Sequence, residues 1–229
     1  MKWLTGFLLA AGMLAAQAGD LSMAKAAFAE KDKALNAEFA ALKKDLRPEL
    51  FTKLQEDQRG WVEHRDYVSD GQAHGDKPEQ SADRWQSMAD MTNSRLAWLK
   101  AWRKLDQKKS WSGSYSDGRG GLLEIVEKDG KCWFVMSVVR GPTFHTGEIS
   151  GQMRVNDSTG WFETKAEGED KPTWLTFLDG LDYAGSVRVA EENTGSFHGA
   201  RAYFQGTYLW TGELSAEEKK NVMEGRIGD

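Results

Sequence analysis

The chain has 229 residues, 28% of them charged and 40% hydrophobic, and a formal net charge of -5 at pH 7. Cys132 is the single cysteine, which excludes an internal disulfide and leaves stability to packing. Residues 20–109 hold 17 Lys and Arg against 16 Asp and Glu, whereas residues 110–229 hold 12 against 19. The second half of the chain is therefore acidic. Because phosphate binding needs clustered lysines and arginines, we expect no nucleic-acid partner. The acidic half could attract a basic protein, or it could simply keep the chain soluble.

The N-terminal residues form charged, apolar and small-residue regions in the order typical of a secretory signal peptide. Met1-Lys2 precedes an apolar run from Trp3 to Ala16, and Ala16-Gln17-Ala18 supplies the small residues of a cleavage site. We predict a cleaved signal peptide over residues 1–18 and a periplasmic or secreted protein without a membrane span. The alternative is an uncleaved N-terminal anchor.

Composition changes along the chain near Lys108-Lys109-Ser110. Glycine is scarce before this point, and glycine, β-branched and aromatic residues dominate after it. We therefore predict a helical domain over residues 19–109, an antiparallel β domain over 110–212 and a tail or short helix over 213–229. The fold class is α+β with two domains.

Apolar residues in the first part recur at spacings of three, four and seven, as on one face of a helix. They predict helices over about 20–46, from Pro48 to about residue 70, and over about 79–106. Pro48 suits a first helical turn, where its missing N–H would be unpaired anyway. Short connections make this a three-helix antiparallel bundle.

In the second part, short apolar runs alternate with turn residues. They predict eight strands, at 113–116, 121–127, 132–139, 147–155, 160–164, 173–178, 186–191 and 202–208. Tight turns such as Lys128-Asp129-Gly130 favour sequential antiparallel pairing. A closed barrel is favoured over a sandwich because closure removes exposed edges. Ser215 and Glu218 form a capping pattern that could begin a last helix.

One spaced set of residues is specific enough to indicate a family. It comprises Leu35-Asn36, Phe39, Leu42 and Leu46, then Leu54, Gln58, Trp61 and Arg65-Asp66, and later Thr92, Arg95 and Leu99. This pattern resembles the N-terminal domain of the LprI family of lysozyme inhibitors over about residues 28–106. The resemblance implies an exported, non-enzymatic inhibitor.

The chain departs from the family pattern at two cysteines. The resemblance would place one a few residues after Arg65-Asp66 and another early in the third helix. This chain has Tyr67-Val68-Ser69 and Ser87-Met88 at those places. Joint loss of both fits loss of a helix-to-helix crosslink, which changes stability but not the fold.

The motif residues have a mainly structural interpretation. Gln58, Trp61 and Arg65 lie on one face of the second helix, so Trp61 should anchor the bundle core. Gln58 and Arg65 should bond backbone ends or a facing helix, and Asp66 could accept a hydrogen bond from Arg95. The alternative is direct contact with a partner.

No set of residues predicts catalysis. The four histidines have no metal-ligand spacing, and Cys132 lies in a strand beside Trp133 and Phe134, where a buried apolar role is the default. We expect no enzymatic activity, no metal and no cofactor.

Two glycine-bounded segments of the β domain are candidates for partner binding. The first contains Arg140, Phe144, His145 and Glu148, and the second contains His198, Arg201 and Tyr203. If both lie at one end of a barrel, they form a polar and aromatic mouth. The simpler alternative is turn geometry, with Arg140 and Arg201 paired to carboxylates such as Glu148.

A third candidate region is a polar connection rich in carboxylates. Its residues Glu163, Glu167, Glu169 and Asp170 could attract a cationic enzyme. We thus expect a protein-binding partner, plausibly lysozyme, inhibited by occlusion of its cleft. The alternative is a carrier of a small ligand or envelope glycan in the barrel interior. Bulky side chains filling that interior would favour the protein binder.

Overall fold

The computed structural model describes the backbone of residues 5–75 and 77–226, and the side chains from residue 20 onward within those ranges. The α-helices it describes are α1 (Thr5–Asp45), α2 (Pro48–Asp70), α3 (Ala82–Ala101) and α4 (Ala216–Met223). The strands are β1 (Gly113–Ser116), β2 (Gly121–Lys128), β3 (Lys131–Arg140), β4 (His145–Asn156), β5 (Thr159–Thr164), β6 (Thr173–Asp179), β7 (Ser186–Glu192) and β8 (Gly206–Gly212). Short 3-10 helices are η1 (Gly71–Ala73), η2 (Pro78–Gln80), η3 (Trp102–Gln107) and η4 (Gly195–Phe197).

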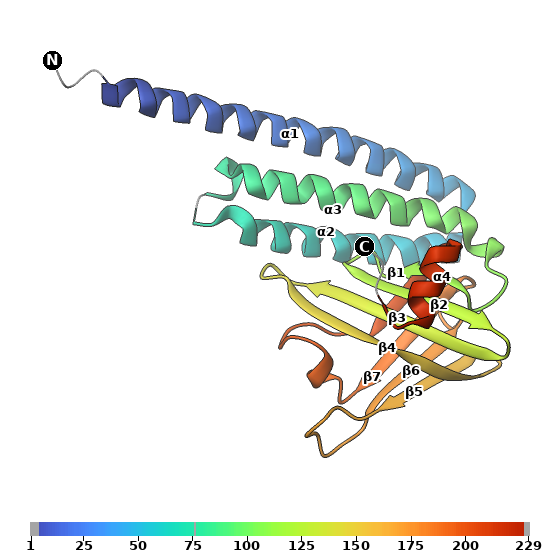
Figure 1. Ribbon diagram of the computed structural model, residues 1–229. Coiled ribbons are helices and arrows are strands. Elements are labelled where there is room, and N and C mark those ends of the chain that lie inside the picture. The colour runs from blue at the N-terminus through green and yellow to red at the C-terminus, as the bar shows by residue number, and fades with distance from the viewer. Residues whose placement is uncertain (1–4, 76, 227–229) are drawn as a thin grey trace.

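Three long helices form a layer above the barrel, with α1 farthest from it (Figure 1). α3 packs against both α1 and α2 and also contacts β8. The apolar faces of the three helices meet in one core, which contains Leu35 and Leu42 of α1, Leu54 and Trp61 of α2, and Leu99 of α3. α2 begins at Pro48 as predicted, because proline is pre-organised for a first helical turn. The third predicted helix is divided instead, since η2 precedes α3 and η3 follows it.

Helix α1 extends further than predicted. It begins at Thr5 and continues without a break past the expected cleavage point near Gly19. The predicted signal peptide falls on residues 1–4, which lie outside the described residues, and on residues 5–18, whose side chains are not described. Among the residues described, no helix has the length and apolar character needed to cross a bilayer.

The eight strands close into an antiparallel barrel in the order β1 to β8, with β8 paired to β1. The α+β class and the barrel are thus confirmed. Tight hairpins account for the sequential order: Asp129 and Gly130 both adopt positive φ, +52° and +72°, as a two-residue turn of this kind requires.

The eighth strand was predicted four residues too early. Residues 202–205 lie in the connection before β8, where the Phe204 N–H donates to Glu191 Oε2 at 2.8 Å and the Ala202 N–H donates to the Gly199 carbonyl at 2.9 Å. The run resembles a strand in sequence because buried and exposed residues alternate along it: Ala202 and Phe204 are buried, and Tyr203 is exposed. Its backbone bonds are made to a side chain and to a turn rather than to a neighbouring strand.

Bulky side chains fill the barrel interior. They include Tyr115, Leu123, Phe134, Met136, Leu175, Phe177, Val187, Tyr208 and Trp210. The two buried phenols are satisfied: Tyr115 donates to the Trp111 carbonyl at 2.7 Å, and Tyr208 donates to the Phe204 carbonyl at 2.8 Å. A filled interior of this kind favours binding at the outer surface over carriage of a ligand inside.

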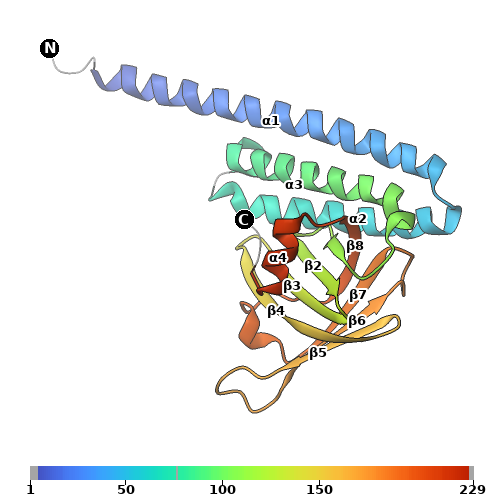
Figure 2. The same ribbon diagram turned by 45° about the vertical axis from the view of Figure 1, so that its right-hand side comes forward.

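Helix α4 closes the chain against the outside of the barrel. Ser215 and Glu218 make the predicted capping box, and Val222 packs with Val126 of β2 and Val135 of β3. Figure 2, turned from the view of Figure 1, shows α4 crossing over β2 and β3.

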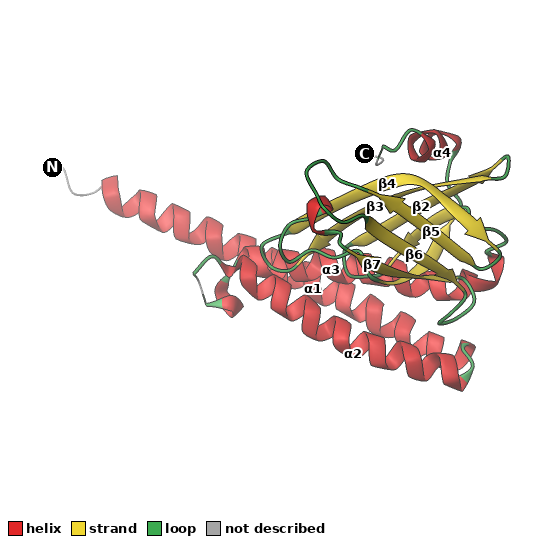
Figure 3. Cartoon of the chain, turned by 90° about the horizontal axis from the view of Figure 1, so that it is seen from below, coloured by secondary structure: helices red, strands yellow, loops and turns green. Residues whose placement is uncertain are grey.

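The helical layer covers one side of the barrel, as the view from below shows (Figure 3). Leu209 of β8 points outward and joins the helical core, and Tyr183 of the β6–β7 connection packs on Trp102 with ring centroids 4.8 Å apart. The helices and the barrel therefore share buried contacts.

Candidate functional site

A network of ion pairs joins the helices to the barrel. Its residues are Asp57, Arg95, Asp117, Arg119 and Arg140, and we call it the junction network. The Asp57 carboxylate of α2 pairs with Arg95 of α3 and, at 2.7 Å, with Arg119 of the β1–β2 connection. Arg119 also donates to the Asp57 carbonyl at 3.1 Å. A single carboxylate thus links α2, α3 and the barrel.

The barrel end of the junction network is centred on Asp117. Arg140 of β3 lies 2.6 Å from its carboxylate, and the Arg119 and Gly121 amides both donate to Asp117 Oδ1 at 2.8 Å. Arg140 is only 2% exposed, and it also donates to the Arg119 carbonyl at 3.0 Å. Each buried charge therefore has a charged partner, as burial requires.

Arg95 is the most enclosed member, with no exposed surface. Its guanidinium lies 3.8 Å from the Trp98 ring centroid and 5.3 Å from that of Trp61, and it donates to Gln58 Oε1 at 2.9 Å. Burial lowers the pKa of Arg95 to about 10, although Asp57 opposes this effect. The group remains charged at neutral pH, held by stacking and by directed hydrogen bonds.

The family-motif residues make contacts within the helical layer. Leu35 and Trp61 are buried in the helical core. Arg65 ties α2 to α1 through Asp32 at 3.4 Å, and Asn36 bonds the same Asp32 at 2.9 Å.

One predicted contact of the motif is wrong. Asp66 does not accept from Arg95; it pairs with its neighbour Arg65 at 2.9 Å. Arg95 instead bonds Asp57 and Gln58, which lie about two turns earlier on α2. An antiparallel crossing of α2 and α3 places Arg95 opposite this earlier part of α2.

Ser69 and Ser87 occupy the places where the family resemblance would put cysteines, and they face each other. Their hydroxyl oxygens are 3.1 Å apart, and Ser69 is fully buried. A hydrogen bond between α2 and α3 therefore stands where a crosslink would otherwise lie.

Beside the junction network lies a largely apolar groove of about 440 Å³. Its walls come from α2, α3, the ends of β2 and β3 and the adjoining connections, and include Trp61, His64, Val68, Met91, Leu122, Val139 and Phe144. Burial, together with the charges of Arg119 and Arg140, lowers the pKa of His64. The imidazole is therefore more readily neutral than a free histidine.

Phe144 stands at the rim of this groove with 52% of its surface exposed. Its backbone has φ +49°, a left-handed conformation that is unfavourable for a bulky residue. Gln72 holds the same connection to the end of α2 by donating to the Pro142 carbonyl at 2.7 Å. The chain thus keeps an exposed aromatic residue in a strained position.

The two candidate segments of the β domain do meet at one end of the barrel. Gly147 forms a bridge with His198, and the Gly199 amide donates to the Thr146 carbonyl at 2.8 Å. The two segments pack against each other and do not form an open cavity at this end, since the Phe204 side chain is fully buried there.

Arg140 pairs with a carboxylate, as the simpler alternative expects, but the carboxylate is that of Asp117 and not that of Glu148. Its guanidinium lies 4.6 Å from the Tyr203 ring centroid. The side chains left at the surface are Phe144, Glu148, Arg201 and Tyr203, with His145 and His198 partly buried.

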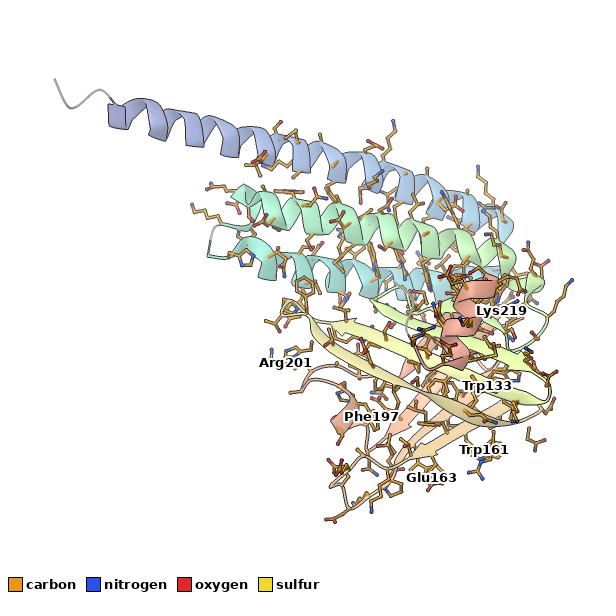
Figure 4. All side chains as sticks on the ribbon, viewed as in Figure 1. Trp133, Trp161, Glu163, Phe197, Arg201 and Lys219 are labelled. Atoms are coloured by element: carbon orange, nitrogen blue, oxygen red, sulfur yellow. The ribbon has the colours of Figure 1, made fainter. Side chains whose placement is uncertain are left out.

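The carboxylates of the connection between β5 and β6 are exposed. Glu163 lies near the end of β5, 3.9 Å from Arg154, while Glu169 accepts from Ser196 Oγ at 2.6 Å. Glu167 and Asp170 lie in the same connection. Figure 4 shows Phe197, Arg201 and Glu163 along the barrel end that carries these connections.

In the described part of the chain, neither the cysteine thiol nor a group of metal-ligand residues is arranged for chemistry. Cys132 is buried in the barrel, and desolvation raises the pKa of its thiol to about 12, so it stays protonated. Within residues 5–75 and 77–226, no three His, Cys, Asp or Glu side chains are placed to hold a metal ion.

Sequence reasoning missed three members of the junction network, Asp57, Asp117 and Arg119. The signal for two of them was the tight Gly118-Arg119-Gly120-Gly121 turn, in which Gly118 has φ +69° and lies against Arg95 and Trp98. A turn so rich in glycine indicates close approach of another element.

The helical layer can be compared with known families now that its contacts are described. Residues 10–99 match the family model of the lysozyme inhibitor LprI. The match covers the part of the chain that contains α1, α2 and most of α3, including Gln58, Trp61 and Arg95. No curated protein and no solved structure matches the chain.

Proposed function

We propose that the protein is an exported, non-enzymatic binding protein that inhibits lysozyme by occluding its cleft. The observation that supports this most is the match of the helical layer to the LprI family. The filled barrel interior adds to it, because a barrel without internal space offers its outer surface for binding.

Charge supplies the attraction in this proposal. Residues 110–229 carry seven more acidic than basic residues, and the β5–β6 connection exposes Glu167, Glu169 and Asp170 side by side. Complementary charge raises the rate of encounter with a cationic enzyme and makes it sensitive to salt.

Exposed aromatic side chains supply the occlusion. Phe144 and Tyr203 are 52% and 40% exposed on the connections at one barrel end. Aromatic residues are the common anchors of protein interfaces, because they bury a large area at small entropic cost. A side chain held this way could enter the substrate cleft and exclude a sugar chain.

The direct test is inhibition of cell-wall clearing. The full chain is expressed with its own N-terminus, and N-terminal sequencing of the exported protein should begin near Gly19. That protein should slow lysozyme, with an affinity that weakens as salt rises. No binding at low ionic strength would reject the proposal.

A matched pair of charge variants tests the steering. Glu167→Gln, Glu169→Gln and Asp170→Asn together should slow association at low salt by about tenfold. The control removes three exposed carboxylates of the helical layer, Glu56→Gln, Glu63→Gln and Glu79→Gln, with the same change in net charge. Equal slowing by both sets would show that only net charge matters.

A further inference from the structure

A second acidic site lies on the opposite side of β2 from the barrel interior, beneath α4. It is a pocket of about 560 Å³ lined by Ser114, Leu122, Glu124, Ser215, Glu217, Glu218 and Asn221. These seven residues include three carboxylates and no lysine or arginine. The lining is thus acidic, and a cation bonded at its edge is Arg226, which donates to Asn221 Oδ1 at 3.1 Å.

Glu124 distinguishes this pocket from an ordinary acidic surface. Its side chain points out of β2 and is only 6% exposed, and its Oε2 atom is buried without a hydrogen-bond partner. A buried carboxylate without a partner is costly, and proteins normally pair such a group. The cost is removed if a cation enters the pocket.

The direction of the pKa shift of Glu124 agrees with this geometry. Burial, and then the nearby Glu218, raises the pKa of Glu124. Glu218 itself is bound to the Ser215 amide at 2.6 Å, which orients its carboxylate at the start of α4. The acidic first turn also offsets the partial positive charge of the helix N-terminus.

We infer that this pocket receives a lysine or arginine side chain of the protein partner, with Glu124, Glu217 and Glu218 as its acceptors. The partner's identity rests on the proposed function, since lysozyme is a cationic enzyme. The Ser114 hydroxyl offers a further acceptor for the several N–H groups of such a cation. Ser215 Oγ and Asn221 Oδ1 already accept from the Glu218 amide and from Arg226 and have one lone pair each to share. Leu122 offers an apolar wall for its aliphatic stem.

A bare metal ion fits the pocket less well. In the described part of the chain no three carboxylate or imidazole groups converge as metal ligands. The volume also exceeds what a single ion fills, whereas a long side chain needs room for both stem and head.

The first experiment compares two isosteric variants of β2. Glu124→Gln removes the pocket carboxylate, and the control Glu127→Gln removes an exposed carboxylate three residues along the same strand. We expect Glu124→Gln to weaken lysozyme binding at least tenfold and Glu127→Gln to change it less than twofold. Equal effects would overturn the inference.

Thermal unfolding separates recognition from folding. Loss of an unpaired buried charge should raise the melting temperature of Glu124→Gln while its affinity falls. A variant that melts lower and binds weakly would show that Glu124 is structural, which would overturn the inference.

The second experiment does not depend on lysozyme. Butylguanidinium is titrated into the full chain, and amide shifts are followed by NMR. Shifts at Glu124, Glu217 and Glu218 that are absent in Glu124→Gln support the pocket, even if the protein fails to bind lysozyme and the proposed function falls. No shifts at these amides, with lysozyme binding intact, would overturn the pocket and leave the proposed function standing.

Discussion

The barrel interior and the junction network are both buried, but they are built from opposite chemistry. The interior holds aliphatic and aromatic side chains, and its phenols bond nearby carbonyls. The junction network holds three arginines and two aspartates between helices and barrel. Apolar packing is non-directional and tolerates changes of shape, whereas buried ion pairs require one geometry. The contrast suggests that the interior stabilises the barrel and that the network fixes how the helical layer lies on it.

The largest expected effect is at Arg95. Arg95→Ala leaves Asp57 with Arg119 as its remaining partner and Trp98 without its stacked cation. It should lower the free energy of unfolding by about 3 kcal/mol, the lower end for a broken buried ion pair. Phe134→Leu in the barrel interior should cost less than about 1.5 kcal/mol, because the change keeps the site apolar and close in size. Urea unfolding of both variants measures the difference. A larger loss for Phe134→Leu would contradict the contrast between the two regions.

The second largest effect on stability is expected from a crosslink within the helical layer. Ser69→Cys with Ser87→Cys should form a disulfide on oxidation, since the two hydroxyl oxygens already lie 3.1 Å apart. Closing a loop of this length should stabilise the protein by about 3 kcal/mol.

Thiol counting provides the check on that crosslink. The oxidised double variant should show one free thiol, that of Cys132, after denaturation, and three after reduction. The stability gain should vanish when reductant is added. Persistence of three thiols under oxidising conditions would mean that the two positions cannot reach disulfide geometry.

The two regions also differ in how far the sequence predicts them. Strand positions follow from alternating apolar residues and turn glycines, so seven strands and the closed barrel were predicted from local pattern. β8 was misplaced because Tyr203 and Phe204 satisfy the same pattern while packing in a connection. Local pattern records the spacing of apolar residues but not which backbone groups pair.

The junction network could not be predicted in this way. Arg95 was identified through its motif, yet its partner Asp57 lies 38 residues earlier and looks like any exposed helical aspartate. Asp117, Arg119 and Arg140 come together only once the barrel has closed and lies under α2 and α3. A single sequence does not show which residues of such distant elements lie opposite each other, so it cannot predict these pairs.

A smaller effect is expected at Phe144, where binding and stability should change in opposite directions. Phe144→Gly relieves a left-handed backbone and should stabilise the protein by about 1 kcal/mol. It also removes an exposed aromatic anchor, so affinity for lysozyme should fall. Phe144→Ala is the control, since it removes the ring without relaxing the backbone. Unchanged affinity in both variants would place the occluding contact elsewhere.

The smallest effect is a pH dependence carried by His64, which lies beside the junction network. Its pKa is lowered in the folded state by burial and by the positive charges of Arg119, Arg140 and Arg95, while Asp117 opposes them. Below the unfolded pKa of about 6.5 the unfolded chain therefore binds more protons than the folded one, and stability falls as pH falls. The loss ends once pH has passed the lowered folded value. Urea unfolding between pH 7.5 and 5 should show this slope in the wild type and a flatter curve in His64→Gln, because glutamine fills similar space without titrating. An identical slope in both proteins would mean that His64 does not carry the pH dependence.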